Sequence, residues 1–114
     1  MESDITRIVI TTDSDRFTIT RSTVRYEAHQ GNGQPKKWSV SSDSAEYSRL
    51  FHELCESVES LMRLDEVPAD MNAEITTFTV MRADSSSEER TFCLPDIQYV
   101  ECFLIINRMV KISS

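Results

Sequence analysis

Glycine and proline are scarce in this chain, where they occupy two and three of the 114 positions. So little of either excludes collagen-like and low-complexity proteins, and a hydrophobic fraction of 39% with a charged fraction of 27% excludes strongly disordered ones. The chain has the commonest length of one folded unit. The sequence therefore predicts that residues 1–114 form a single domain around one core.

Long hydrophobic runs are also missing. The longest run, Cys102 to Ile106, is far shorter than the roughly 20 residues that span a bilayer. The first residues, Met1 to Asp4, are acidic where a secretory signal would be basic, and no apolar stretch of suitable length follows them. We therefore expect no membrane partner and no export.

Cysteine is sparse, and its number is odd. Cys55, Cys93 and Cys102 lie at wide spacings inside apolar segments. A disulfide framework would instead pair an even number of cysteines in a small exported protein. We expect free thiols in a reducing compartment and predict a cytoplasmic location.

Positive charge is in deficit. The net charge is −7 and the pI is about 4.7, so the long-range field repels phosphate backbones and anionic lipid surfaces. The deficit lies in the second part of the chain: residues 1–40 hold six Lys or Arg against five acids, whereas residues 41–114 hold six against fourteen. The sequence predicts no nucleic-acid partner.

Basic residues of the first part nevertheless form a candidate strip on the expected sheet. A basic strip can bind the phosphates of a single-stranded nucleic acid, while aromatic side chains such as Tyr26 and Trp38 stack on its bases. The charge balance of the region is close to zero, and both aromatic side chains are expected on the opposite, inward face. We interpret the strip as the solvated face of an antiparallel sheet. Its members are Arg7, Arg21, Arg25, Lys36 and Lys37.

The first residues show the period-two alternation of β-strands. The pattern covers residues 5–12, turn residues follow at 13–15, and residues 17–20 resume the alternation, as in a β-hairpin. After Thr20 the apolar positions change from odd to even numbers. This change predicts either a bend inside one long strand or two short strands.

Two more strand pairs are expected. The turn signal at Gly31–Pro35 should join residues 24–28 to 36–41, and a second hairpin should join residues 74–82 to 89–94. Period-two alternation then assigns one sheet face to the helices: Ile8, Ile10, Phe17, Ile19, Val24, Tyr26, Trp38, Val40, Phe78, Val80, Phe92 and Leu94. The other face should carry Val9, Thr11, Thr18, Thr20, Thr23, Arg25, Ser39, Thr79 and Thr91.

Two segments show the 3.6-residue period of amphipathic helices. In the first, residues 44–64, Asp43 and Glu46 are spaced as a capping box. In the second, residues 97–110, three further apolar residues, Ile97, Val100 and Leu104, widen the apolar face. The core-facing positions are Tyr47, Leu50, Phe51, Leu54, Val58, Leu61 and Met62 in the first helix, and Tyr99, Cys102, Phe103, Ile106, Met109 and Val110 in the second.

These elements predict an α+β fold in the order ββββ-α-ββ-α. The sheet is antiparallel or mixed, contains about five or six strands, and has both amphipathic helices on one face.

Potential metal ligands gather at one place only, where His52, Cys55 and Glu56 occupy adjacent positions of the first helix. The spacing resembles the zinc-protease pattern His-Glu-x-x-His, but Glu56 stands where the second histidine would be. A zinc site also needs three or four ligands with supporting contacts. We interpret the cluster as a solvated helix face beside a thiol at the edge of the core, and we assign no metal and no cofactor.

Catalytic constellations are not recognisable. Nucleophilic catalysis needs a serine, cysteine or threonine beside a base, and neither His29 nor His52 has a recognisable partner. We therefore expect a protein that is not an enzyme.

Two hypotheses of function follow. The first is a non-catalytic protein-interaction module, in which a partner or a second copy of the chain binds through the 97–110 helix or an open sheet edge. The alternative is a small-ligand-binding protein or enzyme with a cleft between helices and sheet, for which His52, Cys55 and Glu56 are the only candidates.

Overall fold

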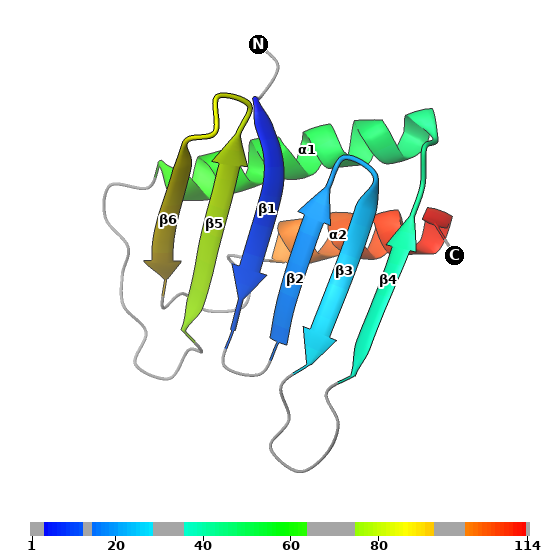
Figure 1. Ribbon diagram of the computed structural model, residues 1–114, viewed down its shortest axis with the longest axis horizontal. Coiled ribbons are helices and arrows are strands. Elements are labelled where there is room, and N and C mark those ends of the chain that lie inside the picture. Colours follow the sequence, from blue (N-terminus) through cyan, green and yellow to red (C-terminus); the bar gives the residue numbers. More distant parts are fainter. Residues whose placement is uncertain (1–3, 13–14, 29–35, 64–74, 93–99, 114) are drawn as a thin grey trace.

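The computed structural model describes residues 4–12, 15–28, 36–63, 75–92 and 100–113. They form one sheet of six strands and two helices (Figure 1), which confirms the predicted α+β class and the order ββββ-α-ββ-α. All strand pairs of these residues are antiparallel. The elements are β1 Ile5–Thr11, β2 Asp15–Thr20, β3 Thr23–Ala28, β4 Lys37–Ser41, α1 Ala45–Met62, β5 Thr76–Arg82, β6 Ser87–Phe92 and α2 Val100–Ser113.

The first strand lies in the middle of the sheet, whose order is β4-β3-β2-β1-β5-β6. Ile8 of β1 is paired with Ile19 of β2 on one side and with Val80 of β5 on the other. The chain therefore leaves the sheet at the β4 edge, runs along α1 and returns beside β1. Strands β4 and β6 are the two edges.

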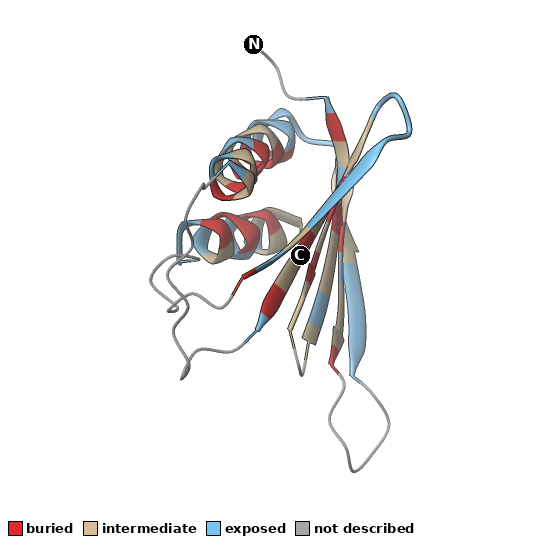
Figure 2. Cartoon of the chain, turned by 90° about the vertical axis from the view of Figure 1, so that its left-hand side faces the viewer, coloured by how far each residue is buried: buried red, intermediate tan, exposed pale blue. Residues whose placement is uncertain are grey.

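Both helices lie on the same face of the sheet, as Figure 2 shows from the side. Alternation places every second strand residue toward them, because successive side chains of a strand point to opposite faces. Phe17 and Val40 are only partly buried at the rim of this core, and Leu94 lies outside the described residues. The predicted core-facing strand residues that are fully buried are Ile8, Ile10, Ile19, Val24, Phe78, Val80 and Phe92.

The change of parity after Thr20 marks a tight turn between two short strands. Residues 21 and 22 form a bend, and Ile19 of β2 is paired with Val24 of β3. The Thr20 hydroxyl accepts a hydrogen bond from the Thr23 amide at 3.1 Å. The alternative of a bend inside one long strand is therefore wrong.

Helix α1 begins one residue later than the capping-box pattern indicated. Its N-cap is Ser44, whose side-chain oxygen accepts a hydrogen bond from the Tyr47 amide at 3.1 Å. Asp43 therefore lies before the cap, and Glu46 stands in the first turn, where a carboxylate favours the positive end of the helix dipole. The predicted apolar stripe is confirmed, from Tyr47 to Leu61.

Helix α2 buries only part of its wide apolar face. Val100 and Leu104, which widen that face in the sequence, are 48% and 54% exposed, so they are not buried within the described part of the chain. The helix lies beside α1 on the sheet, and its buried residues are Cys102, Ile105, Ile106 and Met109. Ile97 and Tyr99 lie outside the described residues. Within the described ranges, neither helix has the length and hydrophobicity that crossing a membrane requires.

Aromatic side chains from β2, β3, β4 and α2 form a row at the rim of the core. The ring of Phe103 from α2 lies 5.9 Å from that of Phe17, which lies 4.9 Å from that of Tyr26. The Tyr26 ring stacks on Trp38 at 5.3 Å. Tyr26 and Trp38 thus occupy the predicted inward face, but Trp38 remains 39% exposed because it sits on an edge strand.

Candidate functional site

The three potential ligands of α1 do not converge. The His52 Nε2 atom lies 3.1 Å from the Glu56 carboxylate at the surface, whereas Cys55 is 2% exposed and faces the core. Burial raises the pKa of the Cys55 thiol to about 12, so the thiol stays protonated and is a poor metal ligand. Among the described residues no group of three His, Cys, Asp or Glu side chains is placed to hold a metal ion.

The thiols that the structure places are also poor nucleophiles. Cys55 and Cys102 are free and buried, and burial raises the pKa of Cys102 to about 12 as well. Because the thiolate is the nucleophilic form, neither cysteine is poised for catalysis. Cys93 and His29 lie outside the described residues.

A groove of about 640 Å³ runs between the two helices. Glu53 and Glu56 of α1 line one side of it, and Leu104 and Arg108 of α2 line the other. The charges are mixed, and the apolar floor consists of residues that already belong to the core, such as Leu61. We see no convergent set of groups in this groove.

The face of the sheet that points away from the helices has a basic hollow of about 430 Å³ over β1, β2 and β3. Arg7, Arg16 and Arg25 line it, one from each strand. The side chains of Arg16 and Arg25 make no hydrogen bond or ion pair with another described residue. The threonine hydroxyls beside them are those of Thr18, Thr20 and Thr23.

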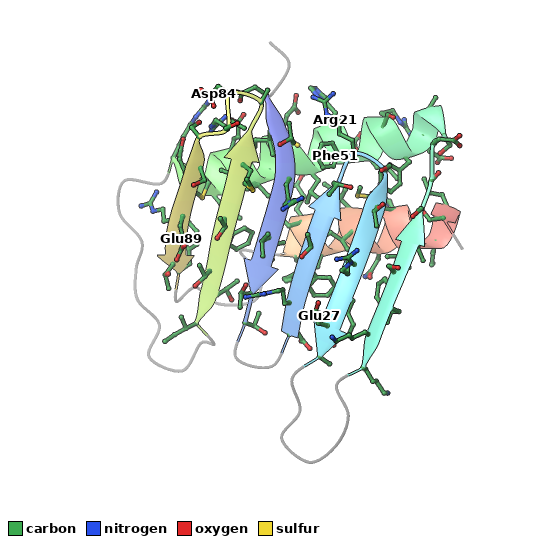
Figure 3. The ribbon with its side chains drawn as sticks, viewed as in Figure 1. Arg21, Glu27, Phe51, Asp84 and Glu89 are labelled. Carbon is green, nitrogen blue, oxygen red and sulfur yellow. The ribbon has the colours of Figure 1, made fainter. Side chains whose placement is uncertain are left out.

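This basic face continues to the β4 edge. A second, shallower hollow of about 300 Å³ shares Arg25 and Glu27 with the first and adds Lys37, Trp38 and Ser39. Arg16 of β2 is paired with Glu27 of β3, which is paired in turn with Lys37 of β4, so the three side chains form one row across the sheet. Glu27 is labelled in Figure 3. On the outward face of β1 to β4, four basic residues therefore stand against one acidic residue.

The β4 edge is open in the described part of the chain. The Ala28 amide donates to the Lys36 carbonyl, and the Ser42 amide donates to the Ser22 carbonyl. In an antiparallel pair the backbone groups of alternate residues face the neighbouring strand, so Trp38 and Val40 are bonded to β3. The backbone groups of Lys37, Ser39 and Ser41 consequently point away from the sheet.

The candidate basic strip is thus only partly assembled. Arg7, Arg25 and Lys37 share the outward face, but Arg21 lies in the β2–β3 turn and lines a separate hollow beside α1. Lys36 precedes β4, and its backbone carbonyl accepts the hydrogen bond from the Ala28 amide.

Sequence reasoning missed Arg16. The signal that could have found it is parity, since Arg16 precedes the inward Phe17 by one residue and must point outward.

Comparison with known proteins adds no functional information: no family model matches the chain, and no curated protein and no solved structure matches it significantly.

Proposed function

We propose that this protein is a non-catalytic protein-interaction module that binds an extended strand of an acidic partner at the β4 edge. The observation that carries the proposal is the open backbone of Lys37, Ser39 and Ser41 beside a basic sheet face. A peptide that adds to a sheet edge gains backbone hydrogen bonds, and its alternate side chains select the partner.

The two faces of β4 define the chemistry of that partner. Outward side chains of the added strand would lie beside Lys37 and close to Arg25, which favours aspartate or glutamate. Inward side chains would lie beside Trp38 and Val40, which favours apolar residues. The partner strand should therefore alternate acidic and apolar residues.

The opposite edge, β6, is a poorer template. Its inward-facing positions include Glu88 and Arg90, and charged residues that point inward on an edge strand discourage pairing with another chain. Both are engaged within the protein: Glu88 lies 3.3 Å from the Arg82 guanidinium, and Arg90 donates to the Met62 carbonyl at 2.7 Å. Glu89, labelled in Figure 3, adds an outward acid that would repel an acidic strand.

The compartment and the partner class belong to the same proposal. Free, buried thiols at Cys55 and Cys102 support a reducing, cytoplasmic location.

Single-stranded nucleic acid is disfavoured as a partner. Tyr26 and Trp38, which could stack on bases, lie on the opposite face of the sheet from the basic residues Arg7, Arg16 and Arg25.

The test is an NMR titration of the isotope-labelled protein with a synthetic peptide that alternates glutamate and valine. We expect the amides of Lys37, Ser39 and Ser41 to gain protection from hydrogen exchange, while those of Trp38 and Val40, already bonded, change little. A lysine–valine peptide should bind at least about tenfold more weakly because its charge is repelled. Equal binding of the two peptides would contradict the proposal.

Ser39→Pro is the decisive variant. It removes the backbone N–H of Ser39, which points away from the sheet and is not bonded to β3. The sheet should therefore fold normally, and peptide affinity should fall about tenfold. Ser39→Ala keeps the backbone N–H and should bind as the parent does. Glu89→Pro removes the corresponding free N–H from the other edge strand, β6, and tests whether the peptide binds there. Loss of binding in Glu89→Pro but not in Ser39→Pro would place the partner at β6.

The same protein can be tested for two other partners, a second copy of the chain and a single-stranded nucleic acid. Native mass spectrometry would reveal a second copy of the chain as a doubled mass, and a doubled mass that survives dilution would replace the proposed partner with self-association. An oligothymidine that displaces the acidic peptide from β4 would also overturn the proposal.

A further inference from the structure

A hollow of about 390 Å³ lies between α1 and the turn that joins β2 to β3. Three elements form it: Ile5 at the start of β1, Arg21 in the turn, and the α1 residues from Ser48 to Cys55 that face them. Its volume lies in the range of small-molecule sites and leaves room for on the order of ten non-hydrogen atoms. In Figure 3, Arg21 is labelled at this turn and Phe51 just below it.

The floor of the hollow is apolar and neutral. Ile5, Phe51 and Cys55 are 1%, 5% and 2% exposed, so each presents only a small area to the hollow. The Cys55 thiol is protonated at neutral pH, because burial raises its pKa to about 12. A hydrated inorganic ion would gain nothing from such a floor, whereas an apolar group would.

The rim of the hollow is cationic. Arg21 makes no hydrogen bond or ion pair with another described residue, and its charge acts on the Cys55 thiol in the direction that lowers the pKa of that group. Arg49 has one loose surface contact, 3.9 Å from Glu46. His52 completes the rim, with its Nε2 atom turned to Glu56. Two guanidinium groups are therefore available to a ligand.

We propose that this hollow binds a small amphipathic carboxylate, whose charged group lies between Arg21 and Arg49 and whose apolar body lies on Phe51. A guanidinium pairs with a carboxylate through two parallel hydrogen bonds, which fixes the orientation of the ligand. The site is independent of the β4 edge, since it lies on the helix side of the sheet and shares no residue with that edge.

Phenylacetate is the probe for this site, and NMR titration is the measurement. We expect saturable shifts at Arg21, Phe51 and Cys55, with an affinity at least about tenfold higher than for 2-phenylethanol, which has the same ring and no charge. Inorganic phosphate, which has charge and no ring, should not saturate these signals. Equal binding of the alcohol, equal binding of phosphate, or no binding of phenylacetate would each overturn the proposal.

Two arginine variants separate binding at this site from a general effect of net charge. Arg21→Gln should weaken phenylacetate binding about tenfold, because it removes one of the two guanidinium groups. Arg16→Gln makes the same charge change on the other face of the sheet and should leave the affinity unchanged. If the two variants weaken binding equally, the loss reflects only the change in net charge and the site does not exist. Ser39→Pro should not affect phenylacetate, so failure at one site is distinguishable from failure at the other.

Discussion

The Arg82 guanidinium lies 3.0 Å from the Glu59 carboxylate, and this pair joins β5 to α1. Both side chains are about four-fifths buried, with exposures of 20% and 19%. Arg82 also contacts Asp4, which precedes β1, and Glu88 of β6. One cation therefore holds four segments together, and its carboxylate neighbours raise its pKa further above the ordinary value.

Replacing Arg82 should destabilise the fold. In Arg82→Met the Glu59 carboxylate stays largely buried without its partner, which should cost about 1–3 kcal/mol in the free energy of unfolding. Arg16→Met, which removes an exposed arginine without an ion pair, should change that free energy by less than about 0.5 kcal/mol. Urea unfolding of the two variants measures the difference, and equal midpoints would show that the Arg82 contacts contribute nothing.

Stability should fall steeply at alkaline pH. Burial raises the pKa of Tyr47 from 10.0 to about 12, and the pKa values of Cys55 and Cys102 from 9.0 to about 12. A raised pKa in the folded state means that the stabilisation is complete below the ordinary pKa and is lost as pH rises toward 12. Each group should lower the free energy of unfolding by up to about 1.4 kcal/mol per pH unit in its window.

Tyr47→Phe isolates one of these contributions. The Tyr47 hydroxyl donates to the Thr20 carbonyl at 3.0 Å, so the variant should lose about 1 kcal/mol at neutral pH. Above the ordinary pKa of tyrosine, its stability should decline less steeply than that of the parent, because no phenol remains to ionise. Urea unfolding across the alkaline range measures both slopes, and parallel slopes would contradict the assignment to Tyr47.

The start of α1 depends on Ser44. Ser44→Ala removes the acceptor of the Tyr47 amide and should cost about 1 kcal/mol. Asp43→Ala, at the residue that the capping-box pattern indicated, should cost less than about 0.5 kcal/mol, because no helix amide depends on it. Thermal unfolding of the two variants decides between the two positions, and a larger loss for Asp43→Ala would restore the earlier assignment.

Adjacent residues of α2 should respond very differently to truncation. Ile105 is 6% exposed and Leu104 is 54% exposed. Ile105→Ala should therefore cost about 2–4 kcal/mol, whereas Leu104→Ala should cost less than about 1 kcal/mol. Chemical unfolding measures both. A loss for Leu104→Ala as large as that for Ile105→Ala would mean that a further surface covers Leu104 in solution.

Much of the fold was predictable, because periodicity reports which side of each element faces the core. The alternation from Ile8 to Phe92 and the stripe from Tyr47 to Leu61 identified the strands, the long helix and the apolar face of the sheet. Periodicity was less reliable at element ends. It indicated Asp43 instead of Ser44, since the cap depends on the local backbone path.

The candidate sites were mostly not predictable. His52, Cys55 and Glu56 are adjacent along α1, yet the helix turns Cys55 into the core and leaves His52 and Glu56 at the surface. Arg21 and Arg25 are close in sequence, but the tight β2–β3 turn sends them to different hollows. Only Arg7, Arg25 and Lys37 of the candidate strip share a face.

The sequence by itself determined the element types, their order and their buried faces, because these follow from the local spacing of apolar residues. Only the tertiary structure decided that β1 lies between β2 and β5, and that β4 and β6 are the edges. It also decided which arginines meet and which backbone groups of β4 stay open. These features depend on pairing between segments distant in the chain, and no local pattern of side chains specifies the partner of a strand.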